Sequence, residues 1–245
     1  MKREKESLLL GAAPYSNSAP LVERLSEADP RARWVAAPPS RLAAALAEGR
    51  LDAALVPVAH LFRFPELEIA APVGVAADGP VRSVLLRFRR SPARTRRVRR
   101  DPASATSNAL AALLLGREVR MVDSPAADAE VVIGDRALFP RRPAVATVDL
   151  AAAWRERTGL PFVFAVWAVR RDFPEKERVA RLVGEARRLG EERLEKIAAR
   201  FARERGGSAA FWYDYLRRSV HYRLGPRDLA GLRRFRRCLA LGRLA

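Results

Sequence analysis

Cysteine and histidine are almost absent from this sequence of 245 residues, which holds one cysteine, Cys238, and two histidines. A single cysteine excludes an internal disulfide, and this favours a reducing compartment such as the cytoplasm. One cysteine and two histidines are also too few for a zinc site built from those residue types. We therefore expect neither a disulfide framework nor a zinc cluster.

Long apolar runs are missing as well. No stretch of about 18 apolar residues occurs, so the sequence predicts no membrane-spanning helix and no membrane partner. The amino terminus imitates a secretory signal, because Lys2 and Arg3 precede an apolar run that begins at Leu8. That run ends at Gly11, and acidic residues interrupt the basic start, so it does not match an export signal. The prediction is a cytoplasmic protein.

Acidic residues are few relative to basic ones: 28 Asp and Glu stand against 46 Lys and Arg, which leaves a net charge of +18. Arginine supplies most of the positive charge and alanine is abundant too, a combination that biased codon usage explains without any function. The functional interpretation is an anionic partner, either nucleic acid, anionic lipid or a small carboxylate. Eight arginines lie between Arg87 and Arg100, but Phe88 is the sole aromatic residue among them, and no helix-turn-helix or zinc spacing is present. We therefore expect a small molecule, and no nucleic acid, as the partner.

The first part of the chain alternates strands and helices. Strands are predicted at 8–12, 34–36 and 51–56, with helices over 20–25 and 40–48 between them. This order predicts a parallel sheet with right-handed crossovers. Ligands on such sheets bind at the carboxyl ends of the strands, where a polar turn follows the first strand.

A second α/β unit follows from residue 87. Apolar strands over 81–88 and 160–169 flank it, and after Arg170 the pattern is helical to the end of the chain. We interpret this as two lobes, the first formed by residues 1–86 and 170–245, and the second by residues 87–169. The two flanking strands would then form a two-stranded hinge beside a central cleft.

A polar segment in the second lobe, residues 101–108, precedes an apolar run that ends at Leu115. Ser104, Thr106 and Ser107 stand at the predicted start of a helix, where hydroxyl groups act as N-caps. The unpaired N–H groups and the helix dipole at such a start suit a carboxylate or a phosphate. The alternative is a capped helix without a ligand.

Several short motifs then occur together and in order. They are Tyr15-Ser-Asn17 followed by Pro20, Gly79-Pro-Val-Arg-Ser-Val-Leu-Leu86, Asp101-Pro-Ala-Ser-Ala-Thr-Ser107, Ile133-Gly-Asp-Arg-Ala-Leu138, the run from Trp154 to Ala168, and Tyr215-Leu-Arg with Tyr222-Arg-Leu-Gly225. In these motifs the sequence resembles the chorismate dehydratases, the MqnA family of the futalosine route to menaquinone. The likeness spans nearly the whole chain. One departure is the turn at 57–60, where family members often carry a pair of serines.

The resemblance implies an α/β, two-lobed fold of the type II periplasmic-binding-protein kind. It also implies a lyase that converts chorismate to 3-[(1-carboxyvinyl)oxy]benzoate and water, with no metal or redox cofactor. Two alternatives stay open within this fold. One is a binding protein that holds a small carboxylate without catalysis. The other is an enzyme of the related MqnD type, which uses a histidine base; neither His60 nor His221 lies in a matching motif.

The reaction that the resemblance implies needs donors for two carboxylates and a group at the reacting carbon. We expect Asn17 to be catalytic, by orienting the C4 hydroxyl or the base. The expected substrate-binding residues are Tyr15, Ser16 and Ser18 in the first lobe, and Ser83, Ser104, Thr106, Ser107 and Asp135 in the second. The base stays open between the enolpyruvyl carboxylate of the substrate and Asp135.

Overall fold

The computed structural model describes residues 7–244, so the amino-terminal basic residues of the signal-like segment lie outside the described part. The chain divides into two compact units. The first comprises the chain up to Ala76 together with Phe164–Gly225, and the second comprises Ala77–Val163 and the chain from Pro226 onward. The chain therefore passes from one unit to the other three times, where two passages were predicted. Residues 77–86 and the carboxyl-terminal helix belong to the second unit instead of the first.

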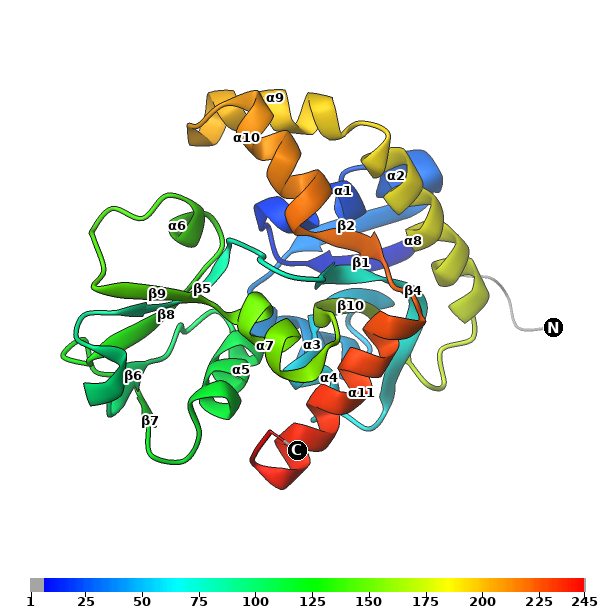
Figure 1. Cartoon of the computed structure of the whole chain (residues 1–245). Helices are drawn as coiled ribbons and strands as arrows, with labels where there is room; N and C mark the ends of the chain where they lie inside the picture. The colour runs from blue at the N-terminus through cyan, green and yellow to red at the C-terminus, as the bar shows by residue number, and fades with distance from the viewer. Residues whose placement is uncertain (1–6, 245) are drawn as a thin grey trace. The chain divides into compact units, whose positions relative to one another are not determined.

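The first unit is built on a six-stranded sheet with the order β11-β4-β10-β3-β1-β2 (Figure 1). The strand bounds are β1 Leu8–Ala12, β2 Ala32–Ala36, β3 Ala53–Pro57, β4 Leu67–Ala77, β10 Phe162–Arg170 and β11 His221–Arg223. The predicted parallel pairing is confirmed, because β1 runs parallel to both β2 and β3. The carboxyl ends of β1 and β3 therefore share one edge of this sheet.

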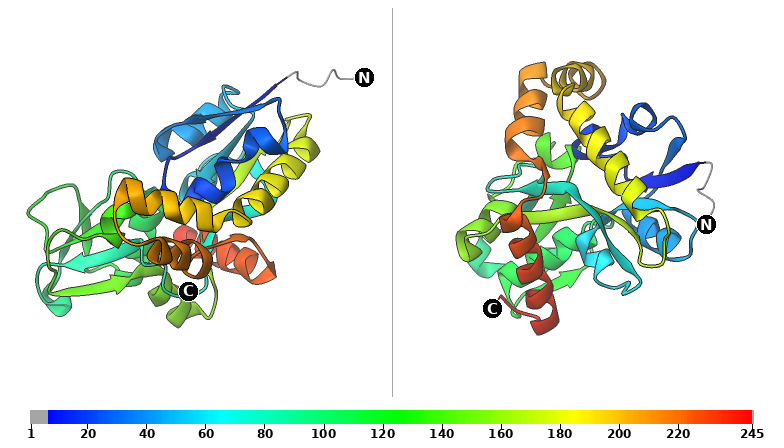
Figure 2. Two further views of the ribbon diagram at one scale, coloured as in Figure 1. Left: turned by 90° about the horizontal axis from the view of Figure 1, so that it is seen from above. Right: turned by 90° about the vertical axis from the view of Figure 1, so that its right-hand side faces the viewer.

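Short helices follow the strands of this sheet, and longer ones cover it. The bounds are α1 Ala19–Val22, α2 Leu25–Ala28, α3 Pro39–Ala47, α4 Val58–Leu61, α8 Lys176–Glu191, α9 Leu194–Arg205 and α10 Ala209–Asp214, with a 3₁₀ turn η1 at Ser16–Ser18 and a π-helical turn η3 at Tyr215–Ser219. Figure 2 shows α8 and α9, in yellow, running alongside α1 and α2, in blue. The predicted turn at 57–60 is thus largely the short helix α4.

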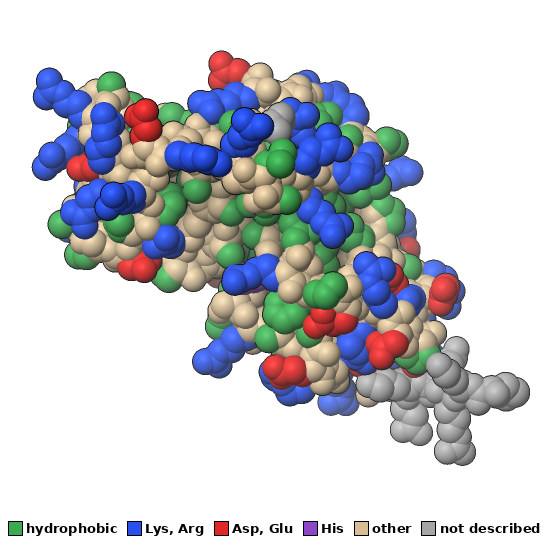
Figure 3. Space-filling view, turned by 90° about the horizontal axis from the view of Figure 1, so that it is seen from below, with side chains coloured by type: hydrophobic (Ala, Val, Ile, Leu, Met, Phe, Trp, Pro, Cys, Tyr) green, Lys and Arg blue, Asp and Glu red, His purple; other side chains and the backbone are tan. Residues whose placement is uncertain are grey.

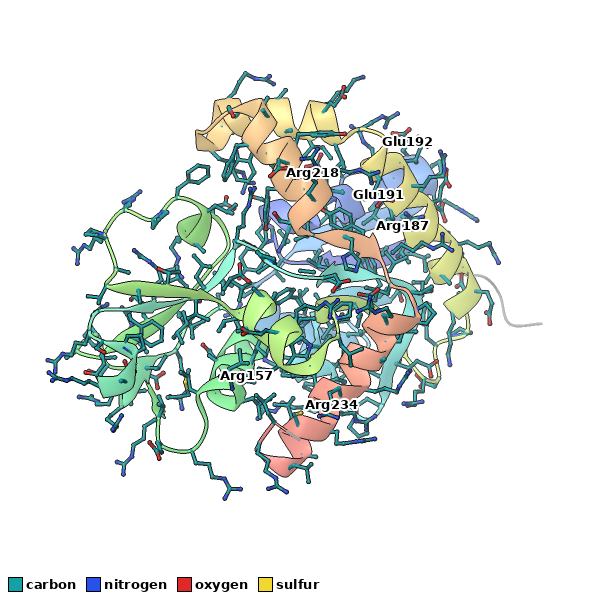
Figure 4. The ribbon with its side chains drawn as sticks, in the orientation of Figure 1. Arg157, Arg187, Glu191, Glu192, Arg218 and Arg234 are labelled. Carbon is teal, nitrogen blue, oxygen red and sulfur yellow. The ribbon has the colours of Figure 1, made fainter. Side chains whose placement is uncertain are left out.

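The second unit has a five-stranded sheet with the order β7-β6-β8-β5-β9. Its elements are β5 Val84–Phe88, a 3₁₀ turn η2 Pro92–Arg94, β6 Arg97–Arg99, α5 Ala105–Leu115, β7 Arg120–Val122, β8 Ala129–Ile133, α6 Asp135–Leu138, β9 Ala146–Asp149, α7 Leu150–Thr158 and α11 Pro226–Leu241. Helix α5 packs against β8, and α7 packs against β5 and β9. Arg157 of α7, labelled in Figure 4, donates a hydrogen bond to the carbonyl of Leu114 at 2.6 Å. This bond satisfies a carbonyl in the last turn of α5 that the helix itself leaves without a donor.

Three aromatic rings explain why α11 belongs to the second unit. Phe235 of α11 meets Trp154 of α7 with ring centroids 5.9 Å apart, and it meets Phe162 at 4.9 Å. Trp154 and Phe162 also meet edge to face, at 5.5 Å, and all three side chains are buried. Edge-to-face contacts add to the free energy gained from burying such large rings.

Among residues 7–244, no helix combines the length and the apolar character needed to cross a bilayer.

Tyr222 of β11 is a buried phenol with no hydrogen-bond partner for its hydroxyl among the described residues. Burial raises the pKa of Tyr222 well above its ordinary value of 10.0, and Tyr215 raises it further, as does Glu191, which is labelled in Figure 4. Because the pKa of Tyr222 is higher in the folded protein, the unfolded chain loses this proton at a lower pH than the folded protein does. The stability that the neutral phenol contributes is therefore complete below about pH 10 and is lost as the pH rises beyond it.

Replacing Tyr222 by phenylalanine is expected to raise the free energy of unfolding by about 1 kcal/mol near neutral pH, because it removes a buried hydroxyl without a partner. The gain should become larger above about pH 10, where the wild-type protein alone loses the contribution of Tyr222. Urea unfolding of both proteins at about pH 7 and about pH 11 measures the difference. An advantage of the same size at both pH values would contradict the assignment of a raised pKa to this phenol.

Candidate functional site

The start of α5 in the second unit carries the predicted hydroxyl groups. Ser104 is the N-cap, and its Oγ accepts a hydrogen bond from the backbone N–H of Ser107 at 3.1 Å. The hydroxyl of Ser104 donates to Oγ of Ser107 at 2.7 Å, and Ser104, Thr106 and Ser107 are all buried. The prediction that these residues begin a helix is confirmed. The first turn of α5 therefore presents buried hydroxyls together with the positive end of the helix dipole.

The segment before α5 is held rigidly by Asp101 and Asn108. The backbone N–H of Asp101 donates to Oδ1 of Asn108 at 2.9 Å, and Nδ2 of Asn108 returns a bond to the carbonyl of Asp101 at 2.8 Å. The buried carboxylate of Asp101 accepts from the N–H of Ala103 at 3.0 Å and from Nη2 of Arg136 at 2.5 Å. Asp101 therefore fixes the geometry of the segment and neutralises a neighbouring arginine.

Asp135 and Ser83 lie in the same part of the second unit. Gly134 precedes α6 with a φ of 65°, a conformation that favours glycine, and its N–H donates to the carbonyl of Ser83 at 2.8 Å. Asp135 then begins α6, whose next residue, Arg136, forms the bond to Asp101. A chain of hydrogen bonds thus links the fully buried Ser83 and the start of α6 to the segment before α5. Of the five site residues predicted in this unit, Ser83, Ser104 and Ser107 belong to this hydrogen-bonded set, and Thr106 and Asp135 are next in sequence to members of it.

Arg82 and Asp149 are residues of this region that the sequence did not reveal. Arg82 has a φ of 62°, the one positive value outside glycine among residues 7–244. Its N–H donates to Oδ2 of Asp149 at 2.6 Å, while Oδ1 of Asp149 caps α7 by accepting from Ala151 and Ala152. A bulky residue in this conformation is strained, and the surrounding contacts have to maintain it. Asp149 thereby fixes the backbone that leads into Ser83.

The turn after β1 in the first unit holds the other predicted residues. Tyr15 precedes η1 and is half-buried, and the hydroxyl of Ser18 donates to the carbonyls of Ala13 at 2.7 Å and Tyr15 at 2.8 Å. Ser18 therefore braces its own turn. Asn17 is half-buried, and its side-chain amide has no hydrogen-bond partner in the described part of the chain. No hydrogen bond of this amide braces the turn within residues 7–244, and the catalytic role of Asn17 stays a prediction.

Arg205 is a cation beside this turn that the sequence did not reveal. Its Nη1 donates to Oγ of the buried Ser16 at 2.8 Å, and its guanidinium lies over the ring of Phe201 at 4.4 Å. The two bonded residues are 189 positions apart in the sequence, so no local pattern indicates the contact. Arg205 fixes the orientation of Ser16 and adds positive charge next to Asn17, which favours an anionic ligand.

The described residues hold no group of three or more His, Cys, Asp or Glu side chains arranged to bind a metal ion. The candidate residues of the second unit carry hydroxyls and the carboxylate of Asp135, and those of the first unit carry hydroxyls, the amide of Asn17 and the guanidinium of Arg205. Such a set can bind carboxylates, orient a substrate and stabilise negative charge as it develops.

A family model described as menaquinone biosynthesis matches residues 8–241. A curated chorismate dehydratase from Thermus thermophilus is 33% identical over 261 aligned positions, which cover 95% of this chain and 95% of that protein. Many solved structures are similar in fold, and two of them serve as examples. One is a protein from Archaeoglobus fulgidus, with a TM-score of 0.77, 15% identity, and 98% of each chain covered.

The other is a Candida albicans protein described as having the generic periplasmic binding protein fold. Its TM-score is 0.66 at 11% identity, with 96% of this chain and 90% of that chain covered. At these identities the likeness concerns the fold alone. It confirms the predicted α/β fold of the periplasmic-binding-protein kind, with a separate sheet in each unit.

Proposed function

The chain belongs to the menaquinone-biosynthesis family, and from that membership we propose that it is a chorismate dehydratase, a lyase that converts chorismate to 3-[(1-carboxyvinyl)oxy]benzoate and water. The observation that carries the proposal is the 33% identity to the Thermus thermophilus chorismate dehydratase over 95% of both chains. The proposal includes action in the cytoplasm, because a dianionic intermediate does not cross the apolar interior of a membrane unaided.

The chemistry places specific demands on the site. The enzyme has to remove the C3 proton and the C4 hydroxyl of chorismate, and the ring then becomes aromatic, which drives the step. The ring carboxylate acidifies the C3 proton through the conjugated double bond, so negative charge develops on that carboxylate. Donors aimed at it stabilise the transition state more than the ground state, which is the condition for a faster reaction.

In the second unit, we assign the ring carboxylate to the hydroxyls of Thr106 and Ser107 and to first-turn N–H groups of α5. Ser104 contributes by orienting Ser107, to which its own hydroxyl donates. Ser104, Thr106 and Ser107 are buried there, so their hydrogen bonds are little weakened by water. Ser83 supplies a further donor, held by its backbone bond to Gly134. Asp135, at the start of α6, is the protein group assigned to assist proton transfer if the substrate's own carboxylate does not accept the proton.

In the first unit, we assign the enolpyruvyl side of the substrate to Tyr15 and Ser16, with Arg205 supplying positive charge through its bond to Ser16. Ser18 acts indirectly, because its hydroxyl holds the turn in place. Asn17 has an unused amide on this turn, and we assign it to orient the departing C4 hydroxyl. The amide is neutral and a weak base, so the C3 proton passes to a carboxylate, either the enolpyruvyl carboxylate of the substrate or Asp135. The same proton is then returned to the departing C4 hydroxyl, which leaves as water.

The test is incubation of the purified protein with chorismate, followed by mass spectrometry and ultraviolet absorbance. The expected result is an aromatic product whose mass is lower than that of chorismate by one water. Binding of chorismate should be measured on the same preparation by calorimetry. Binding without consumption would replace the proposal by a carboxylate-binding protein of the same fold, and an absence of both would reject chorismate as the ligand.

A further inference from the structure

The sheet of the second unit carries a row of charged side chains on one face. Arg99 of β6 is in register with Glu130 of β8, and Glu130 is in register with Arg87 of β5. Cross-strand partners project from the same face of a sheet. Their sequence neighbours Val98 and Phe88 are buried and project to the opposite face. The charged row therefore lies on the face away from this apolar core.

A cavity of about 480 Å³ lies over this row. Its lining includes Arg87, Arg99 and Glu130 from three strands, Arg89 just after β5, and Arg142 from the loop before β9. The volume is within the range of small-molecule sites, which is roughly 300–1,000 Å³. Basic side chains are much more numerous than acidic ones on the face of the molecule in Figure 3, so a single surface arginine carries little information. The distinguishing feature is that several arginines share one cavity.

The charges in the cavity do not cancel. Nη2 of Arg89 pairs with Glu130 at 2.9 Å, so that acid is already used. Arg87 donates to the backbone carbonyl of Arg142, an acceptor that carries no formal charge. The side chains of Arg99 and Arg142 form no hydrogen bond or ion pair with the part of the chain that the structure describes, and Arg99 is half-buried. Three positive charges therefore face one cavity, and an anion bound there would relieve their mutual repulsion.

We propose that this cavity binds a small polyanion of the polyphosphate class, with two or three linked phosphates, either as an inorganic chain or as part of a nucleotide. Guanidinium groups match phosphate oxygens with two parallel hydrogen bonds each. Three guanidinium groups therefore suit several phosphates better than a single carboxylate. The site is separate from the assigned chorismate residues, because Ser83 directly precedes β5 and Arg87 lies near its carboxyl end, roughly 13 Å further along the strand direction.

A nucleic acid fits this cavity less well than a small polyanion does. Binding to a single strand uses exposed aromatic side chains on which bases stack. Phe88 is the aromatic residue among these arginines, and it is buried at 2% exposure, so it offers no stacking platform. Nucleic-acid binding is accordingly an outcome that the experiment has to exclude.

The experiment is calorimetric titration of the whole protein at low ionic strength with sodium tripolyphosphate, with ATP without magnesium, with adenosine, and with a short single-stranded oligonucleotide. Saturable binding of tripolyphosphate or ATP is expected, and adenosine should not bind. Equal affinities for tripolyphosphate and ATP would assign recognition to the phosphate chain alone. A higher affinity for ATP would assign the nucleotide as the ligand.

Two double variants make the test specific. Arg99→Gln with Arg142→Gln is expected to weaken binding about tenfold or more, because charge-assisted bonds are lost. Arg117→Gln with Arg120→Gln removes the same charge from exposed positions of the same unit and should change the affinity by less than about twofold. If both double variants lost affinity for the polyphosphate equally, the binding would depend on the overall positive charge of the unit and not on this cavity, and the proposal would be overturned. An absence of saturable binding, or tighter binding of a single-stranded oligonucleotide at Arg99 and Arg142, would overturn it as well.

Discussion

Replacing Gly190 by alanine is expected to lower the free energy of unfolding by about 3 kcal/mol, the largest stability loss that we predict for a single added methyl group. Gly190 lies near the carboxyl end of α8, where the helix packs against α1. A Cβ at this position would lie 1.8 Å from the carbonyl oxygen of Pro20. The obstructing atom belongs to the backbone, so a change of side-chain rotamer cannot relieve the clash, and the two helices would have to separate.

Gly184 in the same helix provides a matched control. A Cβ built on Gly184 meets nothing within 4 Å. The change Gly184→Ala should therefore show only the helix propensity of alanine and raise the free energy of unfolding by about 1 kcal/mol. Urea unfolding of the two variants should shift the midpoint in opposite directions. Shifts of the same sign would show that α8 and α1 do not approach each other as closely as the structure places them.

The fold of the first unit could be predicted from local pattern because its order is repetitive. Apolar strands alternate with short helices as far as β3, and that order leads to the parallel pairing of β1 with β2 and β3. The strand β6 carries a much weaker local signal. Arg97–Arg99 contains a single apolar residue, Val98, and its extended conformation depends on parallel pairing with β7 and β8. Tertiary pairing overrides a weak local signal at such positions.

The assignment of α11 shows a second limit of sequence patterns. Its periodicity predicts a helix over 226–241, as observed, but an amphipathic pattern does not identify the surface on which the helix packs. The contacts of Phe235 with Trp154 and Phe162 decide that question, and these residues are distant in sequence. Position in the chain had suggested the first lobe.

The site residues also fall into those that a local sequence pattern predicts and those that it does not. The hydroxyls of α5 could be predicted because an N-cap is a local feature, with Ser104 and Ser107 only three positions apart. Arg205 and Asp149 could not, because each acts on a residue that is close only in the folded chain. Arg205 bonds Ser16, and Asp149 accepts from the N–H of Arg82, 67 positions earlier. Groups that orient a site from a distance leave no pattern in the sequence.

The change Asn17→Ala is expected to lower kcat for chorismate dehydration by about 100-fold, the scale for removing one positioned donor from a reacting oxygen. The reason is the unused amide: Asn17 forms no side-chain hydrogen bond in residues 7–244, so its removal takes nothing from the fold. The side chain is half-buried but makes no hydrogen bond to the fold, so the melting temperature should fall by no more than about 2 °C. Steady-state kinetics and calorimetric binding of the aromatic product separate an effect on turnover from an effect on affinity.

Asn108 provides the contrast that makes this result interpretable. Its amide forms two hydrogen bonds with the backbone of Asp101, so Asn108→Ala should lower the free energy of unfolding by about 1–3 kcal/mol as well as disturb the start of α5. A loss of kcat in Asn17→Ala without a loss of stability places the amide at the reacting face of the substrate. A loss of stability equal to that of Asn108→Ala would assign Asn17 to the turn, and unchanged turnover would remove it from the chemistry. If Asn17→Ala lowered the affinity for the product as much as it lowered kcat, Asn17 would bind substrate, transition state and product equally. An interaction made only in the transition state would leave the affinity for the product unchanged.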